Sequence, residues 1–196
     1  QRLWETKALN HFRSFDPGTG VLVVEPGVLI RDIQRYFAPR GWMLAVSPGT
    51  QMVSVGGAIA NDVHGKNHHL EGSFGDHIRG LVLSRTTGQK IVCGPDHQSD
   101  WFDATIGGLG LTGVITEAEI QLKRVVGPWI ESETIPYVGL DAFFELADSS
   151  ETGWEHTVSW IDCLSSHRVR GLFMRGNPSA FRMTRRHQEK TYCLPS

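Results

Sequence analysis

The sequence predicts an α+β fold in which a mixed or antiparallel sheet is flanked by helices. Short runs rich in β-branched residues lie between turn residues, which is typical of buried strands. Apolar residues at helical spacing stand between these runs. Along residues 114–123 apolar and polar side chains alternate, as they do in a strand with one buried face.

The first elements lie before the glycine-rich middle of the chain. Residues 20–27 (GVLVVEPG) predict a buried strand, and residues 42–46 (WMLAV) predict a second one. Between them, apolar residues at positions i, i+4, i+7 and i+8 share one face of a helix. These residues are Leu29, Ile33, Tyr36 and Phe37. Pro39 and Gly41 are expected to end that helix.

A hairpin, a short helix and a long strand are expected after the glycine-rich segment. Residues 77–94 contain two apolar runs joined by a turn at Gly88, which predicts the hairpin. Residues 101–113 predict a helix that passes into a second glycine-rich loop. In the strand at 114–123, the even-numbered side chains are expected to face the core. Ile115 is then an apolar residue on the polar face.

Composition changes near residue 127, where we expect a domain boundary between residues 1–127 and 128–196. The second part begins with a strand over 129–135 and contains further strands at 157–162 and 169–175. Between them, apolar side chains form one stripe of a helix. The stripe consists of Leu140, Phe143, Phe144 and Ala147.

Composition excludes several classes of protein. The chain is 40% hydrophobic and 20% charged, and its formal net charge of -2 argues against a nucleic-acid-binding surface. No apolar run reaches the roughly 18–20 residues of a membrane helix. The three cysteines, Cys93, Cys163 and Cys193, show no CxxC spacing, which favours free thiols in a reducing compartment. We therefore expect a cytoplasmic location, with a membrane-associated or periplasmic-face location of a parent protein as the alternative.

The segment at residues 54–75 is rich in glycine and contains three histidines. His64 and His68 have the H-x-x-x-H spacing that can hold a metal on a helix. Gly65 and Asn67 between them are poor helix formers, and no acidic residue stands at a general-base position. This pattern disfavours a metal site. Histidines that serve only as hydrogen-bonded loop residues remain an alternative.

The glycines of this segment indicate a ligand close to the backbone. Ser54, Gly56 and Gly57 precede a short apolar run, and amides at such a helix start favour anionic oxygens. The spacing matches neither G-x-G-x-x-G nor a P-loop, so it supports neither a Rossmann site nor a P-loop site. A tightly packed turn without a ligand remains equally compatible with the spacing.

Two strings carry a resemblance to a known family. SPGTQMVSVGGAIANDVHGKNHHLEGSFGDHI (residues 47–78) and IGGLGLTGVI (residues 106–115) resemble the PCMH-type FAD-binding domain of FAD-linked oxidases, the vanillyl-alcohol-oxidase-like superfamily. The similarity extends from about Leu9 to Lys123, and the H-G-K-N-H-H string is most similar to decaprenylphosphoryl-β-D-ribose oxidase-like proteins. The resemblance implies FAD as cofactor, bound covalently or noncovalently.

The resemblance also assigns roles to residues. It implies that the backbone near the glycines contacts the flavin, and that His64 and Lys66 face the substrate as the catalytic candidates. Lys66 and Trp160 are the implied substrate-binding residues, although Trp160 is equally compatible with a core position in a strand. The implied cofactor-binding residues are Pro48, Gly49, Thr50, Ser54, Val55, Gly56, Gly57, Asn61, Asp62, Val63, His64, Gly65 and Ile115.

The chain departs from the family pattern in three places. Relatives carry an upstream glycine-rich segment around the FAD pyrophosphate, which does not occur in residues 1–127. Residues 128–196 resemble only the beginning of a substrate or cap domain. Asn61 stands where the most similar relatives have a cysteine, which weakens the assignment of a particular substrate. The sequence is therefore expected to be an internal fragment of an enzyme about twice its length.

The implied function is oxidation of an alcohol on a sugar-like substrate by hydride transfer to flavin N5, in the manner of a polyprenyl-phosphoryl-ribose 2-epimerase or oxidase subunit. An aldonolactone or alditol oxidase of soluble sugars is the alternative enzyme. An inactive FAD-free fragment and a histidine-based metal module are the alternatives from other classes. The expected partners are a small-molecule or lipid-linked sugar and, through surfaces exposed by truncation, a second copy of the chain. No nucleic-acid partner and no transmembrane segment are expected.

Overall fold

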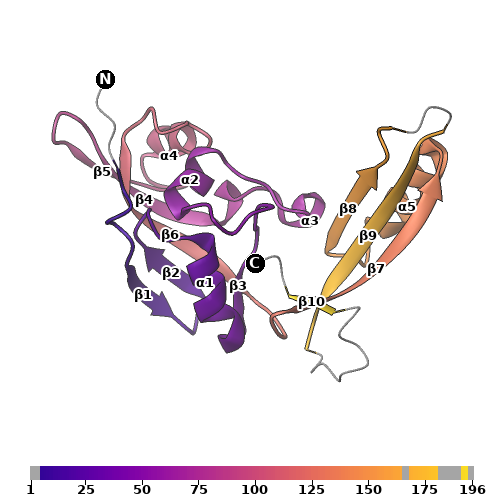
Figure 1. Ribbon diagram of the computed structural model, residues 1–196. Helices are drawn as coiled ribbons and strands as arrows, with labels where there is room; N and C mark the ends of the chain where they lie inside the picture. The colour runs from indigo at the N-terminus through magenta and orange to yellow at the C-terminus, as the bar shows by residue number, and fades with distance from the viewer. Residues whose placement is uncertain (1–4, 165–167, 181–190, 194–196) are drawn as a thin grey trace. The chain divides into compact units, whose positions relative to one another are not determined.

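The computed structural model describes residues 5–164, 168–180 and 191–193 (Figure 1). The chain falls into two compact units that divide between Val125 and Val126. Every strand pair of the described residues is antiparallel, and helices accompany both sheets. The predicted α+β class is therefore confirmed.

In the first unit, a sheet with the strand order β1-β2-β6-β4-β5 carries the fold, and β3 pairs with the end of β6. Its strands are β1 (Phe12–Asp16), β2 (Val21–Val24), β3 (Trp42–Leu44), β4 (Ile78–Ser84), β5 (Lys90–Cys93) and β6 (Val114–Arg124). The predicted hairpin is formed by β4 and β5, and Gly88 in its turn has a φ of 85°. β6 is the longest of the described strands and pairs with three others, so it is the central strand of the unit.

Short helices connect these strands. They are α1 (Ile30–Phe37), η1 (Ala38–Arg40), α2 (Val55–Ala60), α3 (His68–Glu71), η2 (Gly75–His77) and α4 (Ser99–Thr105). The face of α1 that packs on the sheet buries Ile30, Ile33 and Phe37. Tyr36 is 48% exposed, so its predicted place on the buried face is wrong. Its ring instead packs edge-on against Phe37 from the exposed side of the helix.

A bulge changes the phase of β6. The pairing of β4 with β6 shifts register between Val82 and Leu83. As a result, the buried residues of β6 are Ile115, Ala118, Ile120 and Leu122. The prediction of an unbroken even-numbered buried face is therefore wrong at the start of the strand, where Val114 is only half-buried. Ile115 lies in the hydrophobic core, which accounts for its apolar side chain without a ligand.

The second unit is a four-stranded sheet with the order β10-β7-β9-β8 and one helix. Its elements are β7 (Trp129–Val138), α5 (Leu140–Ser150), β8 (His156–Ile161), β9 (Arg170–Ser179) and β10 (Thr191–Cys193). α5 lies along the sheet (Figure 1) and packs Phe143 against Tyr137 and Phe173. Leu140 and Phe144 are exposed, so half of the predicted stripe is wrong.

The two faces of this second sheet differ. Ser159 and Phe173 are opposite each other in neighbouring strands and lie on the face that α5 covers. Trp160 and Leu172 are the next pair along, and therefore point to the other face. Trp160 is 69% exposed, and Leu172 is also exposed. Among the described residues of this unit, the helix α5 packs on the opposite face only.

Two further observations concern the sequence predictions. Among the described residues, no helix combines the length and apolar character needed to cross a membrane. Cys93 is a buried free thiol, and Cys163 is an exposed one. The side chain of Cys193 lies outside the described residues.

Candidate functional site

The turn at residues 48–50, which we call the PGT turn, lies next to a second segment of the chain. A Cβ atom on Gly65 would lie 2.8 Å from the carbonyl oxygen of Ser47, so only glycine permits this approach. One step further along, the Nδ2 of Asn67 donates a 2.8 Å hydrogen bond to the carbonyl oxygen of Ala45. These contacts bring the PGT turn beside residues 64–69, which we call the histidine loop.

The second glycine-rich loop, residues 107–111, also reaches this region. Its amides at Gly107 and Leu109 donate hydrogen bonds of 3.0 and 2.8 Å to the carbonyl oxygens of Ile59 and Ala60 at the end of α2. Asn61, which follows directly, is exposed, and its Nδ2 donates to the carbonyl oxygen of Gly57. The two glycine-rich segments of the sequence therefore meet at the end of α2.

The start of α2 differs from the prediction. Ser54 caps the helix by accepting a hydrogen bond from the amide of Gly57 at 3.2 Å. The amides of Val55 and Gly56 donate at 2.8 Å to the carbonyl oxygens of Val28 and Pro26. These amides are already bound within the chain, so the expectation that they are free to bind an anion is wrong. Contact of Ser54, Val55, Gly56 and Gly57 with a cofactor through other atoms stays a prediction.

The glycines of the segment stand at their positions for different physical reasons. A Cβ on Gly56 would press against the side chain of Pro26, and one on Gly65 against Ser47, so both serve close packing of the chain. Gly49 in the PGT turn is different, because a Cβ there would meet no atom of the chain within 4 Å. Its φ is not positive either. The chain itself therefore gives no reason for a glycine at position 49, whereas a ligand close to the backbone does.

The three histidines of the loop form a row of imidazole rings. The ring centroids of His64 and His68 are 5.5 Å apart, and those of His68 and His69 are 6.1 Å apart. The Nδ1 of His68 lies 3.1 Å from the carbonyl oxygen of Gly65. Because a carbonyl only accepts, Nδ1 carries the hydrogen in this contact. Within the described ranges, no group of three or more His, Cys, Asp or Glu side chains is arranged to hold a metal ion.

Lys66, His64 and His68 are the exposed groups of the loop that can carry charge, and of these the Nδ1 of His68 is already bound to the carbonyl oxygen of Gly65. The ammonium of Lys66 has no hydrogen bond or ion pair with any residue that the structure describes. The Nδ1 of His64 makes only a long 3.5 Å contact with the carbonyl oxygen of Gly65. Both side chains thus remain available for a ligand placed beside the PGT turn.

Asp62 points away from such a ligand. Its Oδ1 accepts a 2.8 Å hydrogen bond from the amide of Gly75, and its backbone has a φ of 42°. The carboxylate therefore fixes the turn that leads into Val63 and His64. Val63 is partly buried against the hydrophobic core. Asp62 and Val63 can therefore make their predicted cofactor contacts through backbone atoms rather than through side chains.

The two remaining predicted site residues lie elsewhere. Ile115 is buried in the core with its side chain between the sheet and the helices, so only its backbone is available to a cofactor. Trp160 is in the second unit, on the exposed apolar face of its sheet.

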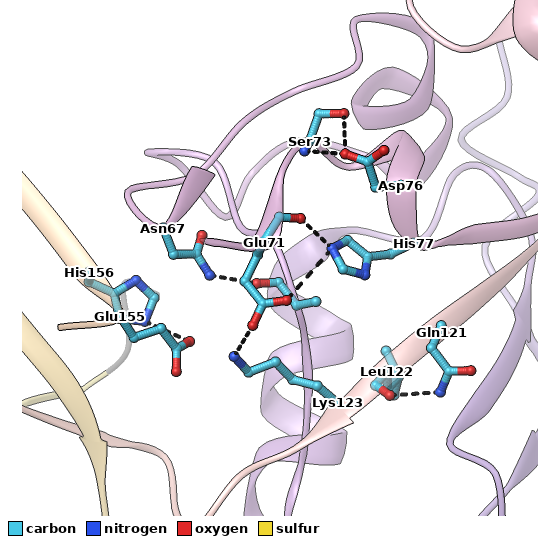
Figure 2. Close-up of polar contacts among 11 residues, drawn as sticks. Asn67, Glu71, Ser73, Asp76, His77, Gln121, Leu122, Lys123, Glu155 and His156 are labelled. Atoms are coloured by element: carbon cyan, nitrogen blue, oxygen red, sulfur yellow. Dashed lines mark hydrogen bonds and ion pairs between the residues drawn. The ribbon is translucent and has the colours of Figure 1, made fainter. Parts of the chain in front are cut away.

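Residues that sequence reasoning missed hold the histidine loop in place. Asn67 is only 1% exposed and is hydrogen-bonded to Ala45 (Figure 2). Glu71 forms an ion pair with Lys123 of β6. Lys123 was part of the polar side of the predicted strand, and periodicity assigns no partner to such a residue. Asn67, between a lysine and two histidines, was the one sequence signal of an anchor, since a buried amide must be hydrogen-bonded.

Comparison with known proteins identifies the class of domain. Residues 3–94 match the family model described as "FAD binding domain". Residues 3–94, which lie within the first unit, therefore belong to an FAD-binding domain of the PCMH type found in FAD-linked oxidases, and FAD is its cofactor. The exposed Gly49 and Lys66, which has no partner among the described residues, fit this cofactor, because they offer an accessible backbone and a positive charge to an anionic group.

Individual relatives are oxidases and dehydrogenases. The chain is 38% identical over 162 residues to decaprenylphosphoryl-beta-D-ribose oxidase of Mycolicibacterium smegmatis, an alignment that covers 81% of this chain and 35% of the relative. It is 27% identical to D-arabinono-1,4-lactone oxidase of Eremothecium gossypii, over 68% of this chain and 24% of the relative. It is 31% identical to cytokinin dehydrogenase 9 of rice, Oryza sativa subsp. japonica, over 68% and 25%. The chain thus spans about a third or less of the length of these relatives.

Proposed function

We propose that the protein is an FAD-dependent oxidoreductase that oxidises an alcohol group of a sugar-like substrate. The observation that carries this proposal is the pairing of an open glycine turn with two exposed, titratable side chains. Gly49 leaves room for a ligand at the PGT turn, while His64 and Lys66 stand on the neighbouring histidine loop. The names of two relatives, an oxidase of a phosphoryl ribose and an oxidase of a sugar lactone, support the choice of a sugar-like substrate.

The residues that would hold FAD come from three loops of the first unit. They are the PGT turn, the turn at residues 61–65 and the second glycine-rich loop. Gly65 approaches Ser47 next to the PGT turn, and the second glycine-rich loop is hydrogen-bonded to the end of α2. When bound, FAD accepts the hydride that leaves the alcohol carbon. The chain's own task is to bind the substrate, orient its alcohol and take up the hydroxyl proton.

In this proposal His64 takes the hydroxyl proton. A neutral imidazole ring with one free nitrogen can act as a general base. Since its Nδ1 is turned toward the carbonyl of Gly65, the Nε2 would receive the proton. Lys66 would bind an anionic group of the substrate, or stabilise negative charge that develops as the hydride leaves. Neither role requires a change in the backbone of the loop.

A phosphate-bearing, lipid-linked sugar is the substrate that the observations favour. Lys66, whose ammonium has no partner among the described residues, suits a phosphate. The relative that acts on a decaprenylphosphoryl sugar is also 38% identical over 81% of the chain, against 27% over 68% for the lactone oxidase. Oxidation of a soluble aldonolactone or alditol is the second candidate.

The test has a binding step and a reaction step. Flavin fluorescence is first titrated with the protein, because saturable quenching reports FAD binding without any substrate. Flavin reduction is then followed by absorbance under anaerobic conditions for the intact protein and for His64→Ala and Lys66→Ala. We expect the His64 variant to lose about two to four orders of magnitude in the reduction rate, as removal of a general base does. Lys90→Ala, an exposed lysine on β5, is the matched control and should change nothing.

Three results would contradict the proposal. Absence of FAD binding would leave an inactive, FAD-free scaffold. Unchanged reduction rates in both variants would remove His64 and Lys66 from the mechanism. Equal rates with a phosphorylated sugar and with its dephosphorylated form would refute the phosphate-binding role of Lys66 and favour a soluble sugar.

A further inference from the structure

The histidine loop is exposed and yet fixed, and hydrophobic packing does not explain how. α3, which ends the loop, buries none of its residues. A one-turn helix is also not stable by itself, because nucleation costs more than a single turn returns. Directional polar contacts must therefore hold the loop where it is.

The first set of these contacts is a closed ring within residues 71–77, visible in Figure 2. The Nε2 of His77 donates a 2.8 Å hydrogen bond to the carbonyl oxygen of Glu71. The carboxylate of Asp76 accepts from the amide of Ser73 at 2.7 Å and from its hydroxyl at 3.2 Å. Gly72 joins the two halves with a φ of 69°, where a Cβ would overlap the Asp76 carboxylate. The ring fixes the position of Ser73 relative to Glu71.

The second contact ties this ring to the sheet. The Nζ of Lys123 lies 2.8 Å from the Oε1 of Glu71, and both side chains are largely screened from water. Lys123 belongs to β6, the strand that pairs with three others. A partly buried ion pair is more directional and less screened than a surface pair. It therefore fixes the ring against a rigid element.

The third contact passes the constraint to the site. Ser73 forms an isolated antiparallel bridge with His64. The path thus leads from β6 through Lys123 and Glu71 to Ser73, and from there to the backbone of His64. At the other end of the loop, Asn67 is held separately by Ala45. The segment that carries His64 and Lys66 is therefore held at two points, by the amide of Asn67 and, through Ser73, by the ion pair of Glu71.

We propose that Glu71 is a positioning residue, which with Lys123 orients His64 and Lys66 toward the ligand at the PGT turn. This inference rests on the proposed function, because orientation matters only where those side chains act on a substrate. Breaking the ion pair leaves the Asn67 anchor in place. The fold should therefore survive, while the histidine loop loses its defined orientation.

The experiment compares variants by the ring signals of the histidines. Two-dimensional proton–nitrogen NMR spectra of the imidazoles are recorded for the intact protein, for Glu71→Gln and for Lys123→Met. We expect the His64 and His68 signals to shift or broaden in both variants. Lys123→Arg keeps the charge and should restore the original signals. The matched control is Arg79→Met, which removes another side-chain contact to β6, the 2.8 Å hydrogen bond to Gln121, outside the loop.

A kinetic measurement separates positioning from a general loss of stability. At saturating substrate, Glu71→Gln and Lys123→Met should reduce flavin roughly ten- to a hundredfold more slowly than the control, as expected for a small misplacement of reacting groups. Their Kd for FAD should stay within about twofold of the control, since a tenfold change in affinity would need about 1.4 kcal/mol.

The outcomes distinguish this inference from the proposed function. If the ring signals of both variants match those of Arg79→Met, the inference is refuted. It is also refuted if His64→Ala abolishes reduction while both variants reduce flavin as fast as the control. If the signals move but His64→Ala reduces flavin normally, the anchor of the loop is supported and the proposed function is the part that fails.

Discussion

The turn that leads into the histidine loop depends on Asp62, and three substitutions there separate its two physical contributions. The residue has a φ of 42°, a left-handed conformation that aspartate, asparagine and glycine tolerate better than alanine does. Its carboxylate also accepts the hydrogen bond of the Gly75 amide, and Gly75 itself is buried. Asp62→Asn keeps both features, Asp62→Gly keeps only the backbone, and Asp62→Ala loses both.

The structure sets the magnitudes. A buried amide that loses its acceptor costs about 1–3 kcal/mol. An alanine held in the left-handed region adds about 1–2 kcal/mol. Asp62→Ala should therefore cost roughly 2–5 kcal/mol, and Asp62→Gly about 1–3 kcal/mol, by the hydrogen bond alone. Asp62→Asn loses only the charge assistance of one hydrogen bond, about 1 kcal/mol.

Thermal unfolding followed by circular dichroism measures the order of these variants. For a chain of this size 1 kcal/mol shifts Tm by about 2–4 °C, so Asp62→Ala should unfold several degrees below Asp62→Asn. Asp103→Ala, an exposed aspartate on α4, is the control and should stay close to the parent. If alanine at position 62 were as stable as asparagine, neither the strain nor the hydrogen bond would matter, and the reasoning would be refuted.

Three further predictions concern other positions. Gly49→Ala should weaken FAD binding at least tenfold, measured by flavin fluorescence. Its Tm should stay within about 2 °C of the parent, because no described atom opposes a Cβ there. A clear fall in Tm without a loss of FAD binding would contradict the ligand explanation. Gly72→Ala should lower Tm and broaden the histidine ring signals, because of its positive φ, and unchanged signals would argue against the ring of contacts. The main-chain amide and ring of His11, aided by Arg13, hold the pKa of Glu25 below its usual value, so its stabilising effect is present above about pH 4.3 and is lost as pH falls through the lower folded-state pKa. Glu25→Gln should therefore flatten the acid limb of a plot of Tm against pH, and an unchanged limb would show that this carboxylate is not linked to unfolding.

Periodicity predicted the elements of this chain because each has a strong local pattern. The hairpin of β4 and β5 and the helix α1 follow from short-range rules. Tyr36 was placed wrongly because a stripe of apolar residues on a short helix is wider than the contact it makes. The aromatic ring found partners at the edge of the helix instead.

The bulge in β6 was not visible in the sequence. One extra residue of β6, Thr116, lies opposite the step from Val82 to Leu83 and moves Ile115 to the core side, and no local signal predicts it. The apolar character of Ile115 was therefore explained by a cofactor, although burial alone is sufficient. The same limit applies to the amides of Val55 and Gly56, whose acceptors lie almost thirty residues earlier in the chain.

The candidate site illustrates how an exposed loop is kept rigid without a core. Apolar contacts scale with buried area, and a loop that must face a ligand has little area to bury. In this chain, Asp62, Asn67 and Glu71 each send a polar side chain inward from the segment that carries His64 and Lys66 outward. Each inward group meets a defined partner, so each fixes a direction as well as a distance. The glycines divide in the same way, because Gly65 permits the chain to approach itself, whereas Gly49 leaves room for a molecule that the chain does not contain. Rigidity from within and access from outside are thus assigned to different residues of one short segment, which is the arrangement that a catalytic loop requires.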